Sequence, residues 1–305
     1  MARIAAKSAA IVANERLLKQ IREDRLPTVW CPGCGHGTIL RSLLIALDRL
    51  NADPDKTVLV SGIGCSGRAP SYLSYSSVHT THGRALAFAT GIKLANPELT
   101  VIVMMGDGDA AAIGGNHLIH AARRNIDLTA LVMNNSIYGM TGGQYSPTTP
   151  SGDTATTAPY GNIEPSFDIC RLGMASGATF VARGTAFHAR ELSDLLHQAI
   201  THKGFSLVEA VSQCPIYYGR QNEMKDAGKM LLWQKEHAIR PEQAAKLSLE
   251  EMGDKFLIGV LHRSDRLEYT EAYRRVIEAA RLSQGKKYRK VDLYQEHREA
   301  MGSGD

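Results

Sequence analysis

Two short, continuously apolar runs constrain the fold more than any other feature of the sequence. Residues 98–105 (ELTVIVMM) and 127–133 (DLTALVM) lack the polar alternation of a half-exposed strand, so each predicts a strand that is buried on both faces. Residues 111–124, which lie between them, are typical of a helix. Strands and helices that alternate in this way form parallel sheets covered by helices on both faces.

The same alternation continues on either side of this unit. Before it, residues 57–64 predict a strand that ends in glycines, and residues 83–95 predict a helix that stops before Pro97. After it we expect a strand, a helix and another strand, over 180–184, 186–202 and 205–211. The sequence therefore predicts an α/β fold with a doubly wound, mostly parallel sheet.

The chain changes character near residue 235, after which charged residues are frequent and the pattern is helical. We therefore divide it into an N-terminal extension (1–29), a central domain (30–234) and a helical C-terminal arm (235–305). The extension begins as a short amphipathic segment. It differs from a signal peptide because no compact apolar stretch precedes a cleavage site.

Composition excludes several classes of function. The chain has 305 residues, and none of its apolar runs reaches the roughly 18 residues of a transmembrane helix, so no membrane span is expected. Its net charge of +4 is too mild to indicate a nucleic-acid-binding protein. Five cysteines cannot all pair with one another, which favours free thiols or metal ligands in a reducing cytoplasm.

Residues with chemical functions follow the predicted strands, at the edge where parallel sheets bind their ligands. GDGD follows the strand over 98–105, and NN ends the next strand, with Asn135 lying 28 residues after Asp107. Glycines permit a diphosphate to approach the backbone N–H groups closely. Carboxylate, amide and carbonyl oxygens are the ligands that suit Mg²⁺.

Two other interpretations of GDGD are a glycine-rich turn without function and a dinucleotide-binding loop. No G-x-G-x-x-G with a later ribose-binding acid is present, which disfavours the dinucleotide. GDG followed by NN at this spacing resembles the thiamine-diphosphate motif. The resemblance implies thiamine diphosphate and Mg²⁺ as cofactors, with Asp107, the Asn135 side chain and the Ile137 backbone carbonyl as the Mg²⁺ ligands.

The cysteines form a second pattern. Cys31 and Cys34 lie in WCPGCGHG, Cys65 follows a strand in GIGCSGR, and Cys214 follows the last apolar strand in QCP. A plain turn, a redox dithiol and a metal site all agree with the first pair alone. If the four thiols face the same sheet edge, they form a site for Zn²⁺ or a [4Fe–4S] cluster. Cys170 has an apolar helical setting and is expected to be an inert core residue.

Six motifs occur in the order found in one known family. They are WCPGCGHG, GIGCSGR, HTTHGRA, GDGDAAAIGGNHLIHAARRN, NNSIYGMTGGQYSPTTP and QCP. From about Trp30 to Gly219, the chain resembles the β subunits of the 2-oxoacid:ferredoxin oxidoreductases. The resemblance implies a sheet of the thiamine-diphosphate-binding type, and it favours a [4Fe–4S] cluster over zinc. The implied cluster ligands are Cys31, Cys34, Cys65 and Cys214.

The resemblance also implies which residues surround the cofactor. Cys65 would connect the cluster with the thiamine, and His82 is a candidate catalytic residue, with helix capping as its other possible role. His117 and His120, spaced i and i+3, are expected to have packing or capping roles. The implied cofactor-binding residues are Ile63, Gly64, Cys65, Ser66, His82, Gly83, Arg84, Gly108, Asp109, Gly139 and Met140.

The reaction implied by the resemblance is the oxidative decarboxylation of a 2-oxoacid. Coenzyme A accepts the acyl group, and ferredoxin carries the electrons away. Thiamine needs a glutamate that activates its pyrimidine ring, and no candidate with a motif occurs in this chain. In this family the partner α subunit supplies that glutamate, so we expect an obligate complex.

Two features favour 2-oxoglutarate, giving succinyl-CoA, as the substrate. IYGMTGGQYSPTTP is similar to the 2-oxoglutarate branch, whereas pyruvate-type members tend to have Asn at the position of Met140. Arg68 is a candidate partner for the distal carboxylate of the substrate, with a surface or interface salt bridge as its alternative role. Pyruvate or a branched-chain oxoacid is the next candidate, and a zinc-stabilised nucleotide-binding module is the alternative from another class.

Overall fold

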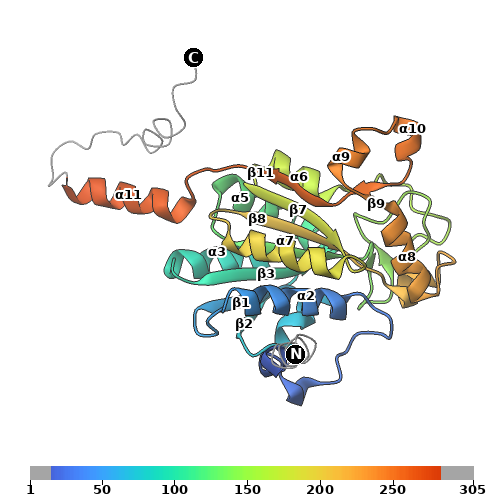
Figure 1. Cartoon of the computed structure of the whole chain (residues 1–305), viewed down its shortest axis with the longest axis horizontal. Coiled ribbons are helices and arrows are strands. Elements are labelled where there is room, and N and C mark those ends of the chain that lie inside the picture. The colour runs from blue at the N-terminus through green and yellow to red at the C-terminus, as the bar shows by residue number, and fades with distance from the viewer. Residues whose placement is uncertain (1–14, 283–305) are drawn as a thin grey trace, which may run out of the picture.

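A seven-stranded sheet crosses the centre of the molecule in the computed structural model, which describes residues 15–282 (Figure 1). The strand order is β11–β7–β8–β4–β3–β1–β2, and every neighbouring pair is parallel except β11 with β7. The strands are β1 (Thr57–Ser61), β2 (Ser76–His79), β3 (Thr100–Gly106), β4 (Thr129–Asn134), β7 (Phe180–Thr185), β8 (Ser206–Val211) and β11 (Gly259–Arg263).

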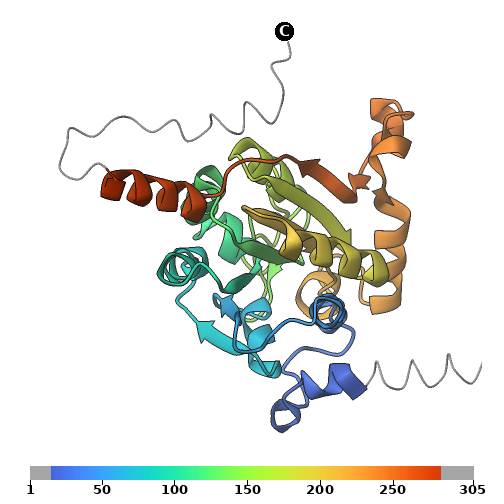
Figure 2. The ribbon, with the colours of Figure 1, turned by 60° about the vertical axis from the view of Figure 1, so that its left-hand side comes forward.

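Helices cover both faces of this sheet, and each face has its own hydrophobic core (Figures 1 and 2). Helices α2 (His36–Arg49) and α7 (Ala189–Thr201) pack on one face. The other face is covered by α3 (Ala85–Ala95), α5 (Gly115–Arg124) and α6 (Ile169–Ala175). Strand β4 is buried along its whole length, as the continuous apolar run predicts.

The order of the strands places a crevice at the carboxyl ends of β1 and β3. The chain passes from β1 outward to β2 and then returns to β3 on the other side of β1. Such a reversal leaves the loops after the two central strands on opposite faces, so a gap for ligands opens between them. Ser61 is aligned with Met104 and Gly106 with Met133, so the ends of the three strands lie at one edge.

Shorter elements form this edge and the C-terminal part. Around the edge lie η1 (Glu23–Arg25), η2 (Ser66–Tyr72), α4 (Asp107–Ala111), the hairpin of β5 (Ile137–Tyr138) and β6 (Gln144–Tyr145), and the π-helical turn η3 (Pro215–Gly219). The remaining elements are α8 (Ala227–His237), β9 (Ala238–Ile239), α9 (Pro241–Ala244), α10 (Leu249–Met252), β10 (Phe256–Leu257) and α11 (Tyr269–Leu282).

The predicted strands and helices of the central domain are present, with one difference. The helix expected over 111–124 is two helices, since α4 begins already at Asp107 and α5 starts at Gly115. The break lies at Ala112, whose ψ of −95° is not helical, and the chain then packs closely at Gly114, where a Cβ would come within 2.2 Å of the Asp109 carbonyl oxygen. Close backbone packing, which the helical pattern does not reveal, therefore interrupts the helix.

The structure describes the C-terminal arm over residues 235–282, where strands accompany the helices, contrary to the expectation of a helical arm over 235–305. The expected boundary falls inside α8, and β11 joins the main sheet antiparallel to β7. Strand β11 is an edge strand with mixed exposure, so it lacks the continuous apolar run that marks the central strands. Residues 1–14 and 283–305 lie outside the described part of the chain, and residues 15–19 are helical. Within residues 15–282, no helix combines the length and the apolar character needed to cross a bilayer.

Phe180 tests the contribution of the core beneath α2 and α7. Its side chain is fully buried, so Phe180→Ala should lower the free energy of unfolding by about 3–5 kcal/mol through lost burial and a residual cavity. Urea denaturation followed by circular dichroism measures the change. Phe88→Ala is the control, because the Phe88 side chain is 51% exposed and its loss should cost far less. Equal losses for the two variants would contradict this account of the core.

Candidate active site

A cavity of about 90 Å³ lies at the carboxyl edge of the sheet, in the predicted crevice. The segments after β1, β3 and β4 form most of its wall, and one histidine comes from the loop after β2 and another from the start of α2. The lining residues are His36, Ile63, Gly64, Cys65, Ser66, His82, Gly106, Asp107, Gly108, Asp109, Met133, Asn135, Ile137, Tyr138, Gly139, Met140 and Thr141.

Asp107, the first residue after β3, lines the cavity with a buried carboxylate. Its Oδ2 atom accepts hydrogen bonds from the hydroxyls of Ser146 (2.5 Å) and Thr148 (2.6 Å). Burial raises the pKa of Asp107, whereas the two hydroxyl groups lower it. A cation beside this carboxylate would favour its ionised form and oppose the effect of burial.

The two asparagines after β4 have different positions. Asn134 turns toward Glu209, to whose Oε1 atom its Nδ2 donates (2.7 Å), whereas Asn135 lines the cavity. Ser136, which follows the two asparagines and precedes Ile137, has a φ of 57°, so the chain turns sharply there. The turn brings the predicted oxygen donors of Asn135 and Ile137 to the cavity that Asp107 also lines.

Asp109 connects two loops of the site through its carboxylate. The backbone N–H of Gly83 donates to Oδ1 (2.6 Å), and His82 Nδ1 lies 2.9 Å from the same oxygen, without hydrogen-bond geometry. Oδ2 lies against Gly62, where a Cβ would come within 1.9 Å of it. Burial raises the pKa of Asp109. The carboxylate therefore joins the loops after β1 and β2, a role that the motif does not reveal.

Three residues named from the sequence lie outside the cavity lining. Gly83 and Arg84 do not line it, and the Arg84 guanidinium instead contacts His117 Nε2 at 2.8 Å. Arg68 is exposed on η2, three residues after Cys65. Among the described residues, the cavity thus receives nine of the eleven predicted cofactor-binding residues and both predicted Mg²⁺-binding side chains.

The loop with Cys31 and Cys34 is tied to the segment that holds Cys214. The backbone N–H of Gly35 donates to the Gln213 carbonyl (3.2 Å), and Gln213 Nε2 donates to the Gly33 carbonyl (3.0 Å). Gly33 has a φ of +80°, and a Cβ there would meet the Ala227 side chain at 2.6 Å. Glycine therefore permits both the turn and its packing against α8.

The four predicted cluster ligands lie close enough to influence one another. Burial raises the pKa of Cys34 to about 12, and the Cys214, Cys65 and Cys31 thiols contribute to this rise. Burial likewise raises the pKa of Cys65 to about 11, with contributions from Cys214 and Cys31. The four thiols therefore lie near one another in the structure. Cys31 is exposed, Cys34 and Cys65 are half-buried, and Cys214 is buried.

Cys65 belongs to both parts of the site. It lines the cavity, and its backbone carbonyl accepts a hydrogen bond from Trp30 Nε1 (2.7 Å). A Cβ on Gly139 would lie 3.7 Å from both Cys65 Sγ and Cys214 Sγ. The four thiols and the cavity therefore meet at Cys65 and Gly139.

The spacing of the thiols bears on which metal group they fit. Tetrahedral zinc with bonds of about 2.3 Å holds its sulfurs about 3.8 Å apart. Among the described residues, the only group of three or more metal-ligating side chains within 4.8 Å of one another is Asp168, Cys170 and Glu209. No three of the four thiol sulfurs therefore all lie within 4.8 Å of one another.

The structure also shows residues that the sequence analysis missed. His36 is buried, which lowers its pKa to about 4, and its Nδ1 atom lies 3.4 Å from Cys34 Sγ. Ser146 and Thr148 lie in the motif NNSIYGMTGGQYSPTTP, but nothing in that motif indicates that their hydroxyls donate hydrogen bonds to Asp107. Cys170 is fully buried, as expected, and its thiol donates to Glu209 Oε2 (3.2 Å).

Comparisons with known proteins point to one family. The chain matches "Thiamine pyrophosphate enzyme, C-terminal TPP binding domain" over residues 62–210. It is 51% identical over 267 residues to "2-oxoglutarate synthase subunit KorB" of Methanothermobacter marburgensis, covering 88% of this chain and 94% of that protein. It is 37% identical over 278 residues to "2-oxoacid:ferredoxin oxidoreductase 2, subunit beta" of Aeropyrum pernix, covering 87% and 89%.

A solved structure agrees with these relatives. The 2-oxoglutarate:ferredoxin oxidoreductase from Magnetococcus marinus, with 2-oxoglutarate, coenzyme A and succinyl-CoA bound, superposes with a TM-score of 0.78. The identity is 35%, and the match covers 90% of this chain and 92% of that chain. Because both chains are covered almost completely, the likeness extends over the carboxyl edge of the sheet and not only over its core.

Gly108 tests how closely the cavity wall is packed. A Cβ at this position would come within 2.2 Å of the Tyr138 ring, so Gly108→Ala should lower the free energy of unfolding by about 1–3 kcal/mol through overpacking. Urea denaturation measures the loss. Gly115→Ala is the matched control, since it also adds one methyl group to a helix but nothing lies within 4 Å of its Cβ. A Gly108→Ala variant as stable as the control would contradict this packing.

Proposed function

Because the chain belongs to the 2-oxoacid:ferredoxin oxidoreductase family as a β subunit, we propose that it carries the cofactors of an enzyme that converts 2-oxoglutarate and coenzyme A to succinyl-CoA, CO₂ and reduced ferredoxin. Family membership confirms the class of enzyme and the fold expected from the six motifs. The observation that carries the proposal is the meeting of the cavity that Asp107 and Asn135 line with the four thiols at one sheet edge, with Cys65 in both.

Mg²⁺ and the diphosphate of thiamine would bind at the turns after β3 and β4. Asp107 and Asn135 offer side-chain oxygens and Ile137 offers its backbone carbonyl, which is an oxygen-only set suited to Mg²⁺. The absence of a Cβ at Gly108 leaves room for the Tyr138 ring beside the cofactor. When bound, thiamine diphosphate supplies the electron sink for decarboxylating a 2-oxoacid.

A [4Fe–4S] cluster would bind to Cys31, Cys34, Cys65 and Cys214. The ferredoxin-linked relatives support the cluster over zinc, and the second role of Cys65 at the cavity wall supports a short path for electrons. All five cysteines are free, which supports a reducing compartment such as the cytoplasm. The exposure of Cys31 supports the exit of electrons to ferredoxin on that side.

The enzyme would be completed by an α subunit. Asp107 and Asp109 are the only carboxylate residues among those lining the cavity, and both are already engaged, by hydroxyl groups and by the Gly83 backbone. The lining contains no glutamate that could hold a proton at the pyrimidine ring of thiamine. We therefore propose that a partner subunit supplies this glutamate across the open side of the cavity.

The names of the relatives support 2-oxoglutarate as the substrate. Met140 lines the cavity as an apolar side chain, so it provides no amide for a small oxoacid such as pyruvate. His82 also faces the cavity beside the Asp109 carboxylate, which supports a role in holding or moving a proton near the substrate.

The reaction can be tested with the complex of this chain and its α subunit, purified without oxygen. The visible absorption of the cluster should decrease when 2-oxoglutarate and coenzyme A are added, because the cluster accepts electrons from the oxidised substrate. Added ferredoxin should restore the absorption. An iron- and thiamine-loaded complex that keeps its absorption with every 2-oxoacid tested would refute the proposed function.

Separate loss of the two cofactors is expected from single substitutions. Cys214→Ser should lower the iron content of the complex well below four per chain, because it removes one of the four proposed thiolate ligands. Asp107→Ala should abolish Mg²⁺ and thiamine diphosphate binding while iron is retained. Iron, sulfide and thiamine assays measure these losses. Cys170→Ala is the matched control, since it removes a cysteine outside the group of four. Iron at the wild-type level in Cys214→Ser would show that Cys214 is not a cluster ligand.

Substrate choice can be tested at Arg68. Arg68→Ala should raise the KM for 2-oxoglutarate about 10- to 100-fold, since a charge-assisted contact of about 1.5–3 kcal/mol with the distal carboxylate is lost. The KM for pyruvate, which lacks that carboxylate, should stay within about twofold. Steady-state kinetics with both substrates measure the difference. Arg84→Ala is the control, because the Arg84 guanidinium contacts His117 away from the cavity. Equal effects on the two substrates would assign Arg68 a different role.

A further inference from the structure

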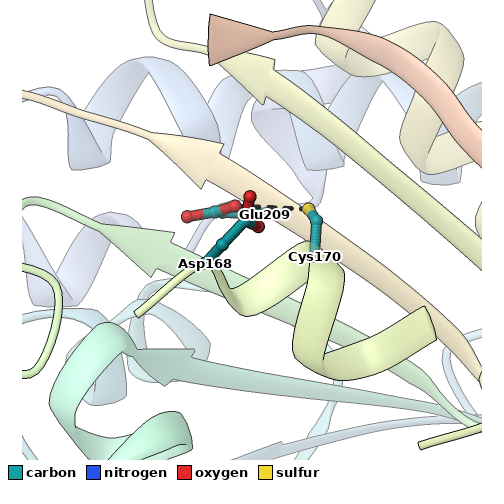
Figure 3. Close-up of side chains that lie close together, drawn as sticks. All are labelled: Asp168, Cys170 and Glu209. Atoms are coloured by element: carbon teal, nitrogen blue, oxygen red, sulfur yellow. Dashed lines mark hydrogen bonds between the residues drawn. The ribbon is translucent and has the colours of Figure 1, made fainter. Parts of the chain in front are cut away.

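A buried charged cluster lies beside the site, at the carboxyl end of β8. Figure 3 shows Asp168 and Cys170, from the start of α6, meeting Glu209 of β8. Arg183 of β7 donates to both carboxylates, through Nη2 to Asp168 Oδ1 (2.6 Å) and through Nε to Glu209 Oε2 (2.6 Å). A metal ion would have to displace this guanidinium, so the cluster is not a metal site despite its three ligating groups.

Glu209 connects this cluster with the turn that holds the proposed Mg²⁺ ligands. Its Oε2 atom is bound by Arg183 and by the Cys170 thiol, which leaves Oε1 to accept from Asn134 Nδ2 (2.7 Å). Glu209 and Asn134 are both buried. Because both side chains are buried, a lost partner would be costly to replace.

Asn134 in turn shapes the chain at the cavity. Its Oδ1 atom accepts from the backbone N–H of Ser136 (3.0 Å), the residue with φ of 57°, and lies 3.0 Å from Thr148 Oγ1. Thr148 Oγ1 also donates to Asp107 Oδ2 (2.6 Å). A continuous path of hydrogen bonds thus runs from Arg183 to the carboxylate of Asp107.

We propose that Glu209, held by Arg183, is a positioning residue that fixes the Asn134 side-chain amide in the one orientation that builds the Mg²⁺-binding turn. This inference rests on the proposed function, because it assigns the turn to Mg²⁺. The amide has a donor end and an acceptor end. The Ser136 N–H can only donate, so it requires the oxygen end, and the Glu209 carboxylate can only accept, so it requires the NH₂ end.

The charge of Glu209 is essential to this arrangement. In Glu209→Gln the Arg183 guanidinium would attract the new amide oxygen, because guanidinium can only donate. The NH₂ group of the glutamine would then face Asn134 and require its oxygen. The Asn134 amide would reverse and place its own NH₂ against the Ser136 N–H. The turn would lose its stabilising bond, and Asn135 and Ile137 would lose their places at the cavity.

The test measures the Mg²⁺ dependence of thiamine diphosphate binding in the complex with the α subunit, by titration calorimetry. Glu209→Gln should raise the half-saturating Mg²⁺ concentration at least tenfold, with iron content unchanged. Cys170→Ala is the matched control, because it removes a partner of Glu209 Oε2 while the bond to Asn134 remains. It should bind as the wild type does, within about twofold.

A second variant distinguishes positioning from a general loss of stability. Asn134→Ala breaks the path but keeps the Arg183–Glu209 pair, so it should fold and show a similar rise in the Mg²⁺ requirement. If Glu209 acts through Asn134, the double variant should be no worse than Asn134→Ala alone. If Glu209→Gln alone fails to fold, Asn134→Ala still tests the path, because wild-type Mg²⁺ dependence in that variant overturns the inference.

Two results would overturn the inference while leaving the proposed function intact. One is wild-type Mg²⁺ dependence in Glu209→Gln or in Asn134→Ala. The other is a double variant whose Mg²⁺ requirement is the product of the two single effects, since independent residues multiply. A wild-type complex without Mg²⁺-dependent binding of thiamine diphosphate would instead overturn the proposed function, and the inference with it.

Discussion

The burial of β3 and β4 between two helical layers is the constraint on which the site depends. Strands that are apolar on both faces leave no position along their length for groups that bind metal ions or charged ligands. Polar residues therefore occur where the strands end, and parallel pairing brings those ends to one edge. Asp107 follows β3 and Asn135 follows β4, so their convergence is a direct result of the sheet.

The thiols and the cavity share this edge because of hydrogen bonds between loops as well as the positions of the strand ends. Cys65 follows β1 and Cys214 follows β8, which are separated in the sheet by β3 and β4. The segment between β8 and η3, which holds Gln213 and Cys214, is tied to the Cys31–Cys34 turn by the reciprocal hydrogen bonds of Gln213. Gly139 lies between the two sulfurs with no side chain, which allows the closest approach of cavity and thiols.

The sequence motifs predicted the site residues that lie within them. They missed the residues whose roles depend on contacts between distant parts of the chain. Asp107, Asn135 and the four thiols carry chemistry that requires their residue types, so their convergence could be predicted from spacing and strand order. The bond from Asn134 to Glu209 joins residues 75 positions apart, and no local signal marks it. Strand β11 was missed for a similar reason, because an edge strand with mixed exposure resembles a loop. The assignment of Arg84 to the cofactor follows the motif, but the side chain turns to His117 on α5.

Cys31 differs from the other three thiols in being open to solvent in this chain. An iron atom bound there would be within reach of small oxidants such as dioxygen, because burial no longer separates the metal from the surrounding water. The opening through which a redox protein could collect electrons would thus also admit molecules that destroy the cluster. A cluster held in this way would need surroundings free of dioxygen, or a partner surface over Cys31, to stay intact.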